Sequence, residues 1–523
     1  MKLMTSAVCL VAMAGLAAQP APFQIEETTI AKVHAAMKAH QLTCHQLVDA
    51  YLQRIAKYDK NEPPINAIVL TNPDALKEAD ELDRRFASGG LIGPLHCVPA
   101  IVKDNYETIG LQSADGSLAL KGFVSDKDAF LVKRIKAAGA IVLAKSNMAE
   151  FAFSPNETVN SLLGTTRNPY DLTRVPAGSS GGTAAAVAAN FGLVGLGSDT
   201  GNSIRGPSSH NALVGIRSTM GLTSRAGVIP LSYLADIAGP MTRTVEDATA
   251  VFQVIVGEDP EDPITARSRG HKVPKYADAL KKDGLKGARL GVLHQAWERP
   301  PNPNNPNAAS AVQIDDDVAK VFAQALADLK TAGATIVDDA KVELPARTGG
   351  GGGGCRGFKY DLDEYLAARG QKAPVHSLAE ILASPAVASF PQSVAQRARQ
   401  AANGTPNGPD SDACKADAAY REAFGAAVTK AMDTLKLTAF VYPTWSFPPR
   451  PLESATTQAG DNSQQFSPTS GFPAINVPMG FTRDNTLPAG MTIFGRAWDE
   501  ATLIRVAYAY EQATHRRHPP SLK

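Results

Sequence analysis

Residues 177–205 constrain the fold of this chain more than any other segment. Gly, Ser and Ala dominate these residues, and only Asp199 and Arg205 carry charge. A solvated surface would need more charged side chains, and the glycines disfavour one continuous helix. We therefore predict two buried loops that pack close together, with an Ala-rich buried helix over about 183–191 between them. Such loops bring serine hydroxyls and backbone N–H groups to one point, which is what acyl transfer requires.

The composition limits the classes of protein that the chain can belong to. Its 523 residues are 44% apolar and 20% charged, which indicates an ordered globular protein with a large core. The formal net charge is +1 and no basic stripe is present, so nucleic acid is not an expected partner. The histidines form no His-x-x-x-His pair and the cysteines no Cys-x-x-Cys pair. A metal site built from neighbouring ligands is therefore not predicted.

The first 21 residues have the pattern of a secretory signal peptide. Lys2 gives a short positive start, residues 7–18 are apolar, and small residues at 15–17 suit cleavage. The apolar run is too short to span a bilayer, and Cys9 lies in no lipobox-like context, so we expect no stable membrane anchor. We predict a periplasmic or secreted protein; the alternative is a buried N-terminal helix.

Removal of the signal would leave four cysteines in an oxidising compartment. This number is too small for a disulfide scaffold in a chain of this length. Cys355 and Cys414 lie in irregular, polar surroundings and could form a disulfide. Cys44 and Cys97 lie in apolar sequence, and we interpret them as small buried hydrophobic residues.

Helical and strand-like patterns alternate along the first half of the chain. Apolar residues at helical spacing over 29–58, with one break, predict two short helices, and residues 73–86 predict another. Short apolar runs at 97–102 and 140–144 predict buried strands, with an amphipathic helix at 130–138 between them. This alternation predicts an α/β fold whose helices cover a mostly parallel or mixed sheet.

The second half is less regular. Residues 256–276 and 299–307 are loops by composition, and residues 349–354 are six consecutive glycines that no packed element can use. We find no internal repeat and no linker between self-sufficient halves, so we predict one large domain with a variable insertion over about 255–435. The remaining patterns predict helices at 310–332, 411–433 and 500–512, and strands at 438–443, 474–479 and 490–494.

Ser203 is the first candidate for a nucleophile. A serine hydroxyl attacks a carbonyl efficiently only when a base removes its proton. The residues around Ser203 do not form Gly-x-Ser-x-Gly, and no serine stands three residues before a lysine. The sequence therefore offers neither a nucleophile elbow nor a Ser-x-x-Lys pair.

Two residues could act as the base. Lys103 ends the apolar run at 98–102 and either extends to water or lies buried, where loss of solvation favours the neutral amine. To act as a base, its pKa must fall by about 3, which corresponds to about 4 kcal/mol against the charged form. His210 is the alternative, with Asp199 to orient it in a Ser-His-Asp arrangement. Spacing alone does not choose between Lys103 and His210.

Long motifs surround these candidates. They are Val-Pro-Ala-Ile-Val-Lys-Asp-Asn at 98–105, Gly-Ser-Ser-Gly-Gly at 178–182, Gly-Ser-Asp-Thr-Gly-Asn-Ser-Ile-Arg at 197–205, Ser-Gly-Phe-Pro-Ala-Ile-Asn-Val-Pro-Met-Gly at 470–480, and a C-terminal part at 495–511. In this order they resemble the motifs of the amidase signature family. The resemblance covers residues 25–515, most weakly in the insertion. It implies one α/β/α domain with a mixed central sheet covered by helices on both faces.

The resemblance implies a Ser-cisSer-Lys triad. Ser203 would be the nucleophile and Lys103 the base. Ser179 would be the bridging serine, whose peptide bond would be cis. The oxyanion hole would be formed by four backbone N–H groups, those of Thr200, Gly201, Asn202 and Ser203.

Other motif residues would support this triad. Ser180 would support the loop, and Asp199 and Arg205 would pair behind it, although a purely structural role suits that pair equally. Two positions depart from the family pattern, since Asn202 stands where many members carry Gly and Cys97 where Gly is common. Neither removes a member of the triad, although both bear on substrate preference.

The implied function is that of an amidase. It would hydrolyse a linear C–N amide bond of a small-molecule substrate through an acyl-enzyme on Ser203, with no metal or organic cofactor. An ester or carbamate hydrolase would use the same triad, and the sequence does not rank these reactions. The family also contains the glutaminase subunit of a tRNA amidotransferase, which the signal peptide argues against. The intact triad argues against a non-catalytic binding protein.

The sequence offers less about substrate and assembly. Candidate pocket walls are residues 151–153, Trp445 and Phe472, although aromatic residues are more often plain core. The glycines at 349–354 are interpreted as a passive surface loop rather than a mobile lid. The oligomeric state is left open.

Overall fold

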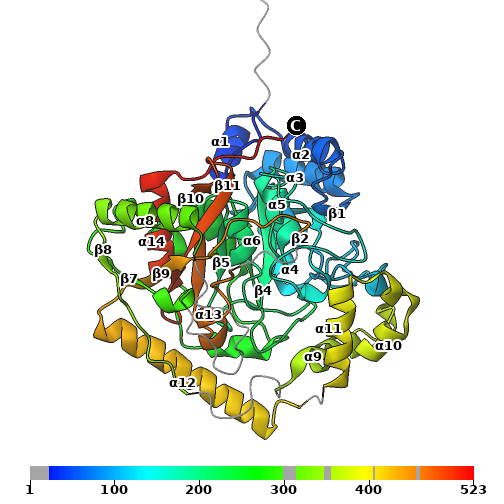
Figure 1. Ribbon diagram of the computed structural model, residues 1–523. Helices are drawn as coiled ribbons and strands as arrows, with labels where there is room; N and C mark the ends of the chain where they lie inside the picture. Colours follow the sequence, from blue (N-terminus) through cyan, green and yellow to red (C-terminus); the bar gives the residue numbers. More distant parts are fainter. Residues whose placement is uncertain (1–22, 299–313, 347–354, 405–406, 455–459, 523) are drawn as a thin grey trace, which may run out of the picture.

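The computed structural model describes residues 23–298, 314–346, 355–404, 407–454 and 460–522, which fold around one sheet of eleven strands (Figure 1). The strands are β1 (Ile68–Thr71), β2 (Pro99–Lys103), β3 (Ile141–Ser146), β4 (Val194–Asp199), β5 (Val214–Arg217), β6 (Ile237–Thr242), β7 (Arg289–Val292), β8 (Thr335–Val337), β9 (Ala439–Pro443), β10 (Ala474–Thr482) and β11 (Leu487–Phe494). The α-helices are α1 (Ile30–Lys38), α2 (Cys44–Tyr58), α3 (Ala75–Gly89), α4 (Phe130–Ala137), α5 (Gly181–Ala188), α6 (Arg205–His210), α7 (Val245–Ile255), α8 (Asp316–Thr331), α9 (Gly357–Ala367), α10 (Leu378–Ala383), α11 (Gln392–Asn403), α12 (Asp412–Thr434), α13 (Phe466–Ser470) and α14 (Glu500–Thr514).

The sheet is mixed, in the order β1-β3-β2-β4-β6-β5-β10-β11-β9-β7-β8. Strand β2 runs parallel to β3 and β4, and β7 runs parallel to β8 and β9. Every pairing from β4 across to β9 is antiparallel. Two parallel groups therefore flank an antiparallel centre, which confirms the predicted α/β fold with a mixed sheet.

Helices cover both faces of this sheet. Helices α5 and α6 pack against strands β2, β4, β10 and β11, whereas α4, α7 and α14 pack against one another and against the other face. Because both faces are covered, strands β2, β3 and β4 are buried at every residue rather than at alternate ones. The continuous apolar runs at 97–102 and 140–144 therefore predicted strands correctly.

Helix α5 lies directly on the sheet because glycines remove side chains where the backbones approach most closely. A Cβ at Gly195 in β4 would lie 2.6 Å from Thr183 Cγ2 of α5. A Cβ at Gly182 would lie 2.2 Å from the carbonyl oxygen of Asn147. All eight residues of α5 are buried, so the low charge of residues 177–205 reflects burial of the whole segment.

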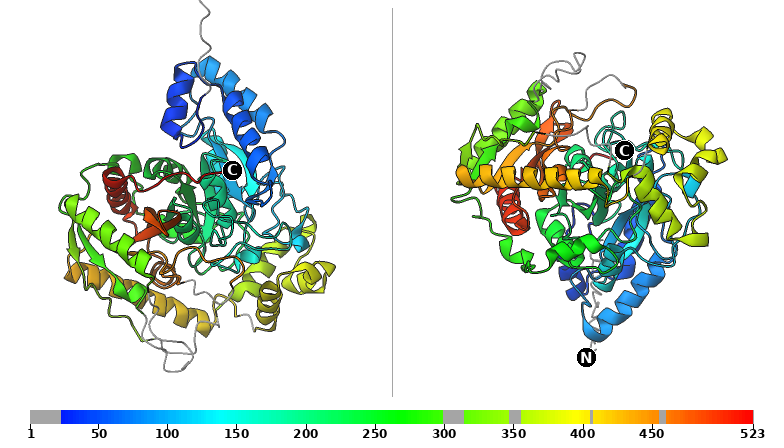
Figure 2. Two further views of the ribbon diagram at one scale, coloured as in Figure 1. Left: turned by 45° about the horizontal axis from the view of Figure 1, so that its top comes forward. Right: turned by 90° about the horizontal axis from the view of Figure 1, so that it is seen from below.

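Only part of the range 255–435 stands apart from the sheet. Strands β7 and β8 belong to the sheet and α8 packs on it. Helices α9, α10 and α11, which we call the helical lobe, form a separate cluster at one edge of the molecule in all three views (Figures 1 and 2). The lobe has its own apolar core, to which the sheet domain contributes Leu120, Phe151, Phe153 and Ile229.

Two disulfides join distant parts of the chain. The bond between Cys355 and Cys414, which the sequence allowed, joins the residues before α9 to the first turn of α12, with Cα atoms 4.5 Å apart. Cys44 and Cys97 are buried, as predicted, but they also form a disulfide, with Cα atoms 5.5 Å apart. Their interpretation as simple hydrophobic residues is therefore wrong, because folding brings α2 against the segment that precedes β2.

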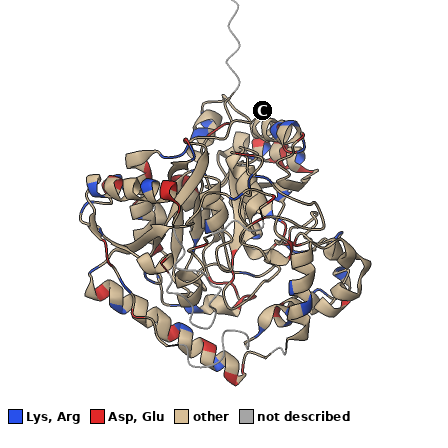
Figure 3. Ribbon diagram, in the orientation of Figure 1, with Lys and Arg blue, Asp and Glu red and all other residues tan. Residues whose placement is uncertain are grey.

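Two predictions concern residues outside the described part of the chain: the signal peptide at 1–21 and the glycine loop at 349–354. Charges of both signs are spread along the outer helices, such as α12 (Figure 3). No helix within the described ranges combines the length and the apolar composition needed to cross a membrane.

Candidate active site

Lys103 lies at the end of strand β2 and is fully buried. Its Nζ donates hydrogen bonds to Ser179 Oγ at 2.7 Å and to Ser198 Oγ at 2.8 Å. Burial lowers the pKa of Lys103 to about 7, although nearby carboxyls, Asp115 first among them, act to raise it. A large fraction of this amine is therefore neutral at physiological pH, and a neutral amine can accept a proton.

The loop before α5 presents Ser179 to this lysine. The Gly178–Ser179 peptide bond is cis, and the Ser179 carbonyl accepts a hydrogen bond from the N–H of Ala149 at 3.0 Å. Ser180 Oγ donates to the carbonyl of Ser198 at 3.2 Å and accepts from the N–H of the same residue at 3.4 Å. Ser180 thus fastens the loop to strand β4, as the motif resemblance implied. The contact from Ser198 to Lys103 was missed, although Ser198 lies inside a motif.

Ser203 lies at a cleft of about 550 Å³ that residues 200–203 help to line. The Ser203 side chain belongs to a residue that is 5% exposed, so the hydroxyl reaches the cleft from an otherwise buried position. Within the described chain, none of the N–H groups of residues 200–203 donates a hydrogen bond to the protein. These groups are therefore free to hold an oxyanion in the cleft. A Cβ at Gly201 would lie 1.9 Å from Gln464 Oε1, so the loop requires glycine there.

Asp199 and Arg205 pair behind this loop, and a second arginine joins them. Arg205 Nε donates to Asp199 Oδ2 at 3.1 Å, and Arg217 Nη1 donates to Asp199 Oδ1 at 3.0 Å. Burial alone would raise the pKa of Asp199, but the two guanidinium groups lower it to about 2. The carboxylate also accepts from the N–H of Ile204 at 3.2 Å, which ties the arginines to the Ser203 loop. Arg217 was not predicted, because it lies outside the motifs.

Asn202 is the position where the sequence departs from the family pattern. Its side chain is fully buried against Gly206, where a Cβ would lie 2.3 Å from Asn202 Nδ2. Among the described residues, neither atom of this carboxamide has a hydrogen-bond partner. The backbone of Asn202 still lines the cleft, so the side chain does not remove the N–H from the oxyanion position.

The structure does not assemble a Ser-His-Asp arrangement. The His210 ring stacks on Trp445, with centroids 4.6 Å apart, and burial lowers the pKa of His210 to about 3. Asp199, which would have to orient the imidazole, is held by the two arginines. Lys103 is therefore the better candidate for the base.

The predicted cleft walls are only partly correct. Ala152 and Phe153 line the cleft, but Phe151 packs into the core shared with the helical lobe, and Trp445 stacks on His210. Phe472 packs against Phe494, with ring centroids 6.5 Å apart. Several lining residues were not predicted, because no motif contains them: Leu231, Arg397, Asp461, Asn462 and Gln464.

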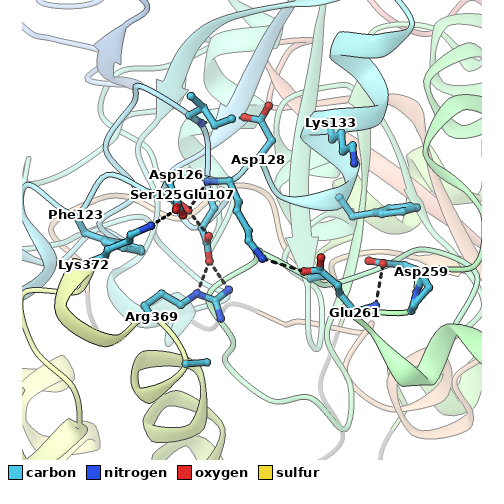
Figure 4. Close-up of a pocket in the computed structure, with 17 residues that line it drawn as sticks. Glu107, Phe123, Ser125, Asp126, Asp128, Lys133, Asp259, Glu261, Arg369 and Lys372 are labelled. Atoms are coloured by element: carbon cyan, nitrogen blue, oxygen red, sulfur yellow. Dashed lines mark hydrogen bonds and ion pairs between the residues drawn. The ribbon is translucent and has the colours of Figure 1, made fainter.

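A second cleft, of about 910 Å³, lies between the helical lobe and the sheet domain (Figure 4). It contains none of the predicted site residues, and opposite charges that line it are paired with each other. These pairs fasten the lobe to the sheet domain rather than form a reactive centre. They are Arg369 with Glu107, Lys372 with Asp126, and Lys127 with Glu261. Among the described residues, no three His, Cys, Asp or Glu side chains converge as metal ligands would.

Comparisons with known proteins agree with this arrangement. The sequence profile of the family described as amidase matches residues 46–504. The solved structure of a peptide amidase from Stenotrophomonas maltophilia is 37% identical with a TM-score of 0.82, covering 96% of this chain and 100% of that one. A probable amidase from Arabidopsis thaliana is 32% identical over 518 residues, which are 95% of this chain and 92% of that protein. A glutamyl-tRNA(Gln) amidotransferase subunit from Carboxydothermus hydrogenoformans is 32% identical over 501 residues, which are 92% and 97% of the two chains.

The fold and these similarities define a hydrolase of the carbon–nitrogen bonds of amides. The chain belongs to the amidase signature family, which confirms the resemblance seen in the motifs.

Proposed function

We propose that this protein hydrolyses linear amides through an acyl-enzyme on Ser203, with Lys103 as the base and Ser179 as the proton relay. The observation that carries the proposal is the 2.7 Å hydrogen bond between the buried Lys103 amine and Ser179 Oγ. A neutral amine and a hydroxyl in contact form the base-and-relay pair that a serine nucleophile needs.

The first half of the reaction forms the acyl-enzyme. Ser203 Oγ attacks the carbonyl carbon of the amide while its proton passes to Ser179 and the Ser179 proton passes to Lys103. The negative oxygen of the tetrahedral intermediate accepts hydrogen bonds from the free N–H groups of residues 200–203, each of which contributes about 10²–10³ in rate. When the C–N bond breaks, the lysine returns the proton through Ser179 to the leaving nitrogen, which departs as ammonia or an amine.

The second half regenerates the enzyme. A water molecule attacks the ester carbonyl and gives a proton to Lys103 through Ser179. The C–O bond to Ser203 then breaks, Ser203 recovers its proton by the same route, and a carboxylic acid is released. Each half uses the same groups in the same places, which agrees with the buried and fixed setting of Lys103.

We infer that peptide amides are the first substrates to test. The similarity to a peptide amidase supports this class, and the cleft offers groups suited to it. Arg397 lines the cleft from the helical lobe and donates to the carbonyl of Phe153, and burial without any acidic influence lowers its pKa. Such a guanidinium favours substrates with carbonyl or carboxylate oxygens near the scissile bond.

We also propose that the protein acts in the periplasm or outside the cell. The signal pattern at 1–21 supports this location, and so do the two disulfides, because disulfides persist in oxidising compartments. Fractionation of cells that produce the full-length chain, with N-terminal sequencing of the mature protein, tests the location.

The mechanism is tested by variants assayed on a panel of primary amides, anilides, peptide amides, carbamates and esters. Lys103→Ala and Ser203→Ala should each lower kcat by about 10³-fold or more while circular dichroism stays unchanged. His210→Ala is the matched control and should keep most of the activity. An active Lys103→Ala together with an inactive His210→Ala would show that the base is wrongly assigned.

The panel also separates the alternatives. Turnover of carbamates or esters alone would replace the amide proposal with those reactions of the same triad. Turnover of glutamine with activity that depends on partner proteins would favour the glutaminase of a tRNA amidotransferase, which the Carboxydothermus relative represents. Mass spectrometry of the intact protein should detect a covalent acyl group on Ser203 for any substrate whose deacylation is slow.

A further inference from the structure

Asp115 is a buried carboxyl that the proposed mechanism leaves without a role. It is 1% exposed, and neither of its carboxylate oxygens has a hydrogen-bond partner among the described residues. Burial raises the pKa of Asp115 well above its usual value, and the positive charge of Lys103 is the main influence that lowers it. Because an unpartnered buried carboxyl is costly, it is retained only where something compensates for it.

The backbone around Asp115 is attached to the end of strand β2. The N–H groups of Ala114 and Gly116 donate to Asp104 Oδ2 at 3.2 and 3.1 Å, and Asp104 directly follows Lys103 in the chain. The carbonyl of Asp115 accepts from the N–H of Phe151 at 3.1 Å. These contacts hold Asp115 close to the lysine, and Asp115 is the carboxyl with the largest electrostatic effect on Lys103.

The other charged groups that face this pair already have partners. Asp199 is held by two arginines, Asp236 by the hydroxyl of Thr200 and by backbone N–H groups, and Glu150 by Ser161. Asp104 accepts the two N–H groups described above, and Lys145 donates to Ser113 Oγ at 2.9 Å and to the carbonyl of Tyr106. Asp115 is thus the one among these carboxyls whose two oxygens have no partner in the described chain.

We propose that Asp115 is a positioning residue whose carboxylate balances the ammonium that forms on Lys103 during the reaction. This inference rests on the proposed function. Nζ of Lys103 contacts two hydroxyls, those of Ser179 and Ser198, so the third N–H of an ammonium has no partner in the described chain. In the reactive form the amine is neutral and the carboxylate is ionised. Transfer of the serine proton to the amine then places an ammonium beside a carboxylate, and the buried pair carries no net charge.

The consequence is a shift in the pH at which the site becomes reactive. A carboxylate beside Lys103 strengthens proton binding by the pair, so removal of the carboxylate lets the amine lose its proton at lower pH. Asp115→Asn keeps the shape of the side chain and removes its charge. The acid limb of the pH profile should therefore move down by about 1 pH unit or more.

The experiment measures the rate at which phenylmethanesulfonyl fluoride labels Ser203, followed by intact mass as a function of pH. The serine oxygen forms a bond to sulfur, fluoride leaves, and the proton goes to Lys103, so the rate reports the base without any knowledge of the substrate. Asp247→Asn is the matched control, because Asp247 is also 1% exposed with one unpartnered oxygen but does not act on Lys103. It should leave the acid limb in place.

The outcomes separate this inference from the proposed function. A wild-type protein that is never labelled on Ser203 overturns the proposed function and this inference together. Normal labelling of the wild type, with the acid limb of Asp115→Asn at the same or a higher pH, overturns this inference alone. Asp115→Glu, which keeps the carboxylate, should bring the limb back toward the wild-type position. A merely structural role of Asp115 would change the melting temperature of the variants but not the pH of the limb.

Discussion

Lys103 and His210 are both buried, and burial has opposite consequences for their use as bases. Loss of solvation lowers the pKa of each group, to about 7 for the lysine and to about 3 for the histidine. The lysine starts from a high value and arrives in the range that suits a base at neutral pH, whereas the histidine becomes too weak to hold a proton. At the scale of the residue, the same physical cause therefore selects the amine and rejects the imidazole.

The lysine predicts a pH profile for the wild-type enzyme. Below pH 7 the amine binds a proton and cannot accept one from Ser179, so kcat/KM should rise with pH and level off above about pH 8. Initial rates on a substrate of constant charge, such as a neutral peptide amide, measure this profile. An acid limb near pH 4 would point to a carboxyl as the base instead.

At the scale of the element, the site depends on how closely α5 and its preceding loop approach the sheet. Asn147 follows β3, and its backbone lies against Gly182 in the first turn of α5. The same turn is preceded by Ser179 and Ser180, which contact Lys103 and β4. A displacement of α5 would therefore move the relay serine away from the lysine.

Gly182→Ala tests this dependence. The new Cβ would lie 2.2 Å from a backbone oxygen that cannot move aside, so the free energy of unfolding should fall by about 1–3 kcal/mol and kcat should fall with it. Gly89→Ala is the control, because Gly89 ends helix α3 with open space around it and should change stability by no more than about 1 kcal/mol. Urea unfolding and the amide assay measure both. Equal stability of the two variants would contradict the close approach.

At the scale of the whole molecule, the catalytic cleft is shared between the sheet domain and the helical lobe. Arg397 of the lobe lines the cleft, while the ion pairs of Figure 4 fasten the lobe to the sheet domain. One disulfide ties the start of the lobe to α12, and the other ties α2 to the segment before the lysine strand. The long-range arrangement around the site thus has covalent support at two points.

Removal of the Cys44–Cys97 disulfide should destabilise the whole fold. The bond closes a loop with a sequence separation of 53, and Cys44→Ser with Cys97→Ser should lower the free energy of unfolding by about 2–4 kcal/mol. Calorimetry of the variant and of the wild type, with and without reductant, measures the effect. Identical melting temperatures for reduced and oxidised wild-type protein would contradict it. The pair Cys355→Ser and Cys414→Ser is the comparison, since that bond attaches the lobe rather than the sheet.

The sequence by itself determined the fold class, the alternation of elements and the motif residues that meet at the candidate site. It could do so because buried strands are continuous apolar runs, and because the motifs hold Lys103, Ser179 and Ser203 at short range to the elements that carry them. Only the tertiary structure decided between Lys103 and His210, because the pKa of each depends on burial and on which charges surround it. It also decided the Cys44–Cys97 pairing, the second arginine on Asp199 and the contribution of Arg397 to the cleft. These contacts join residues far apart in the chain, and local sequence carries no record of such distances.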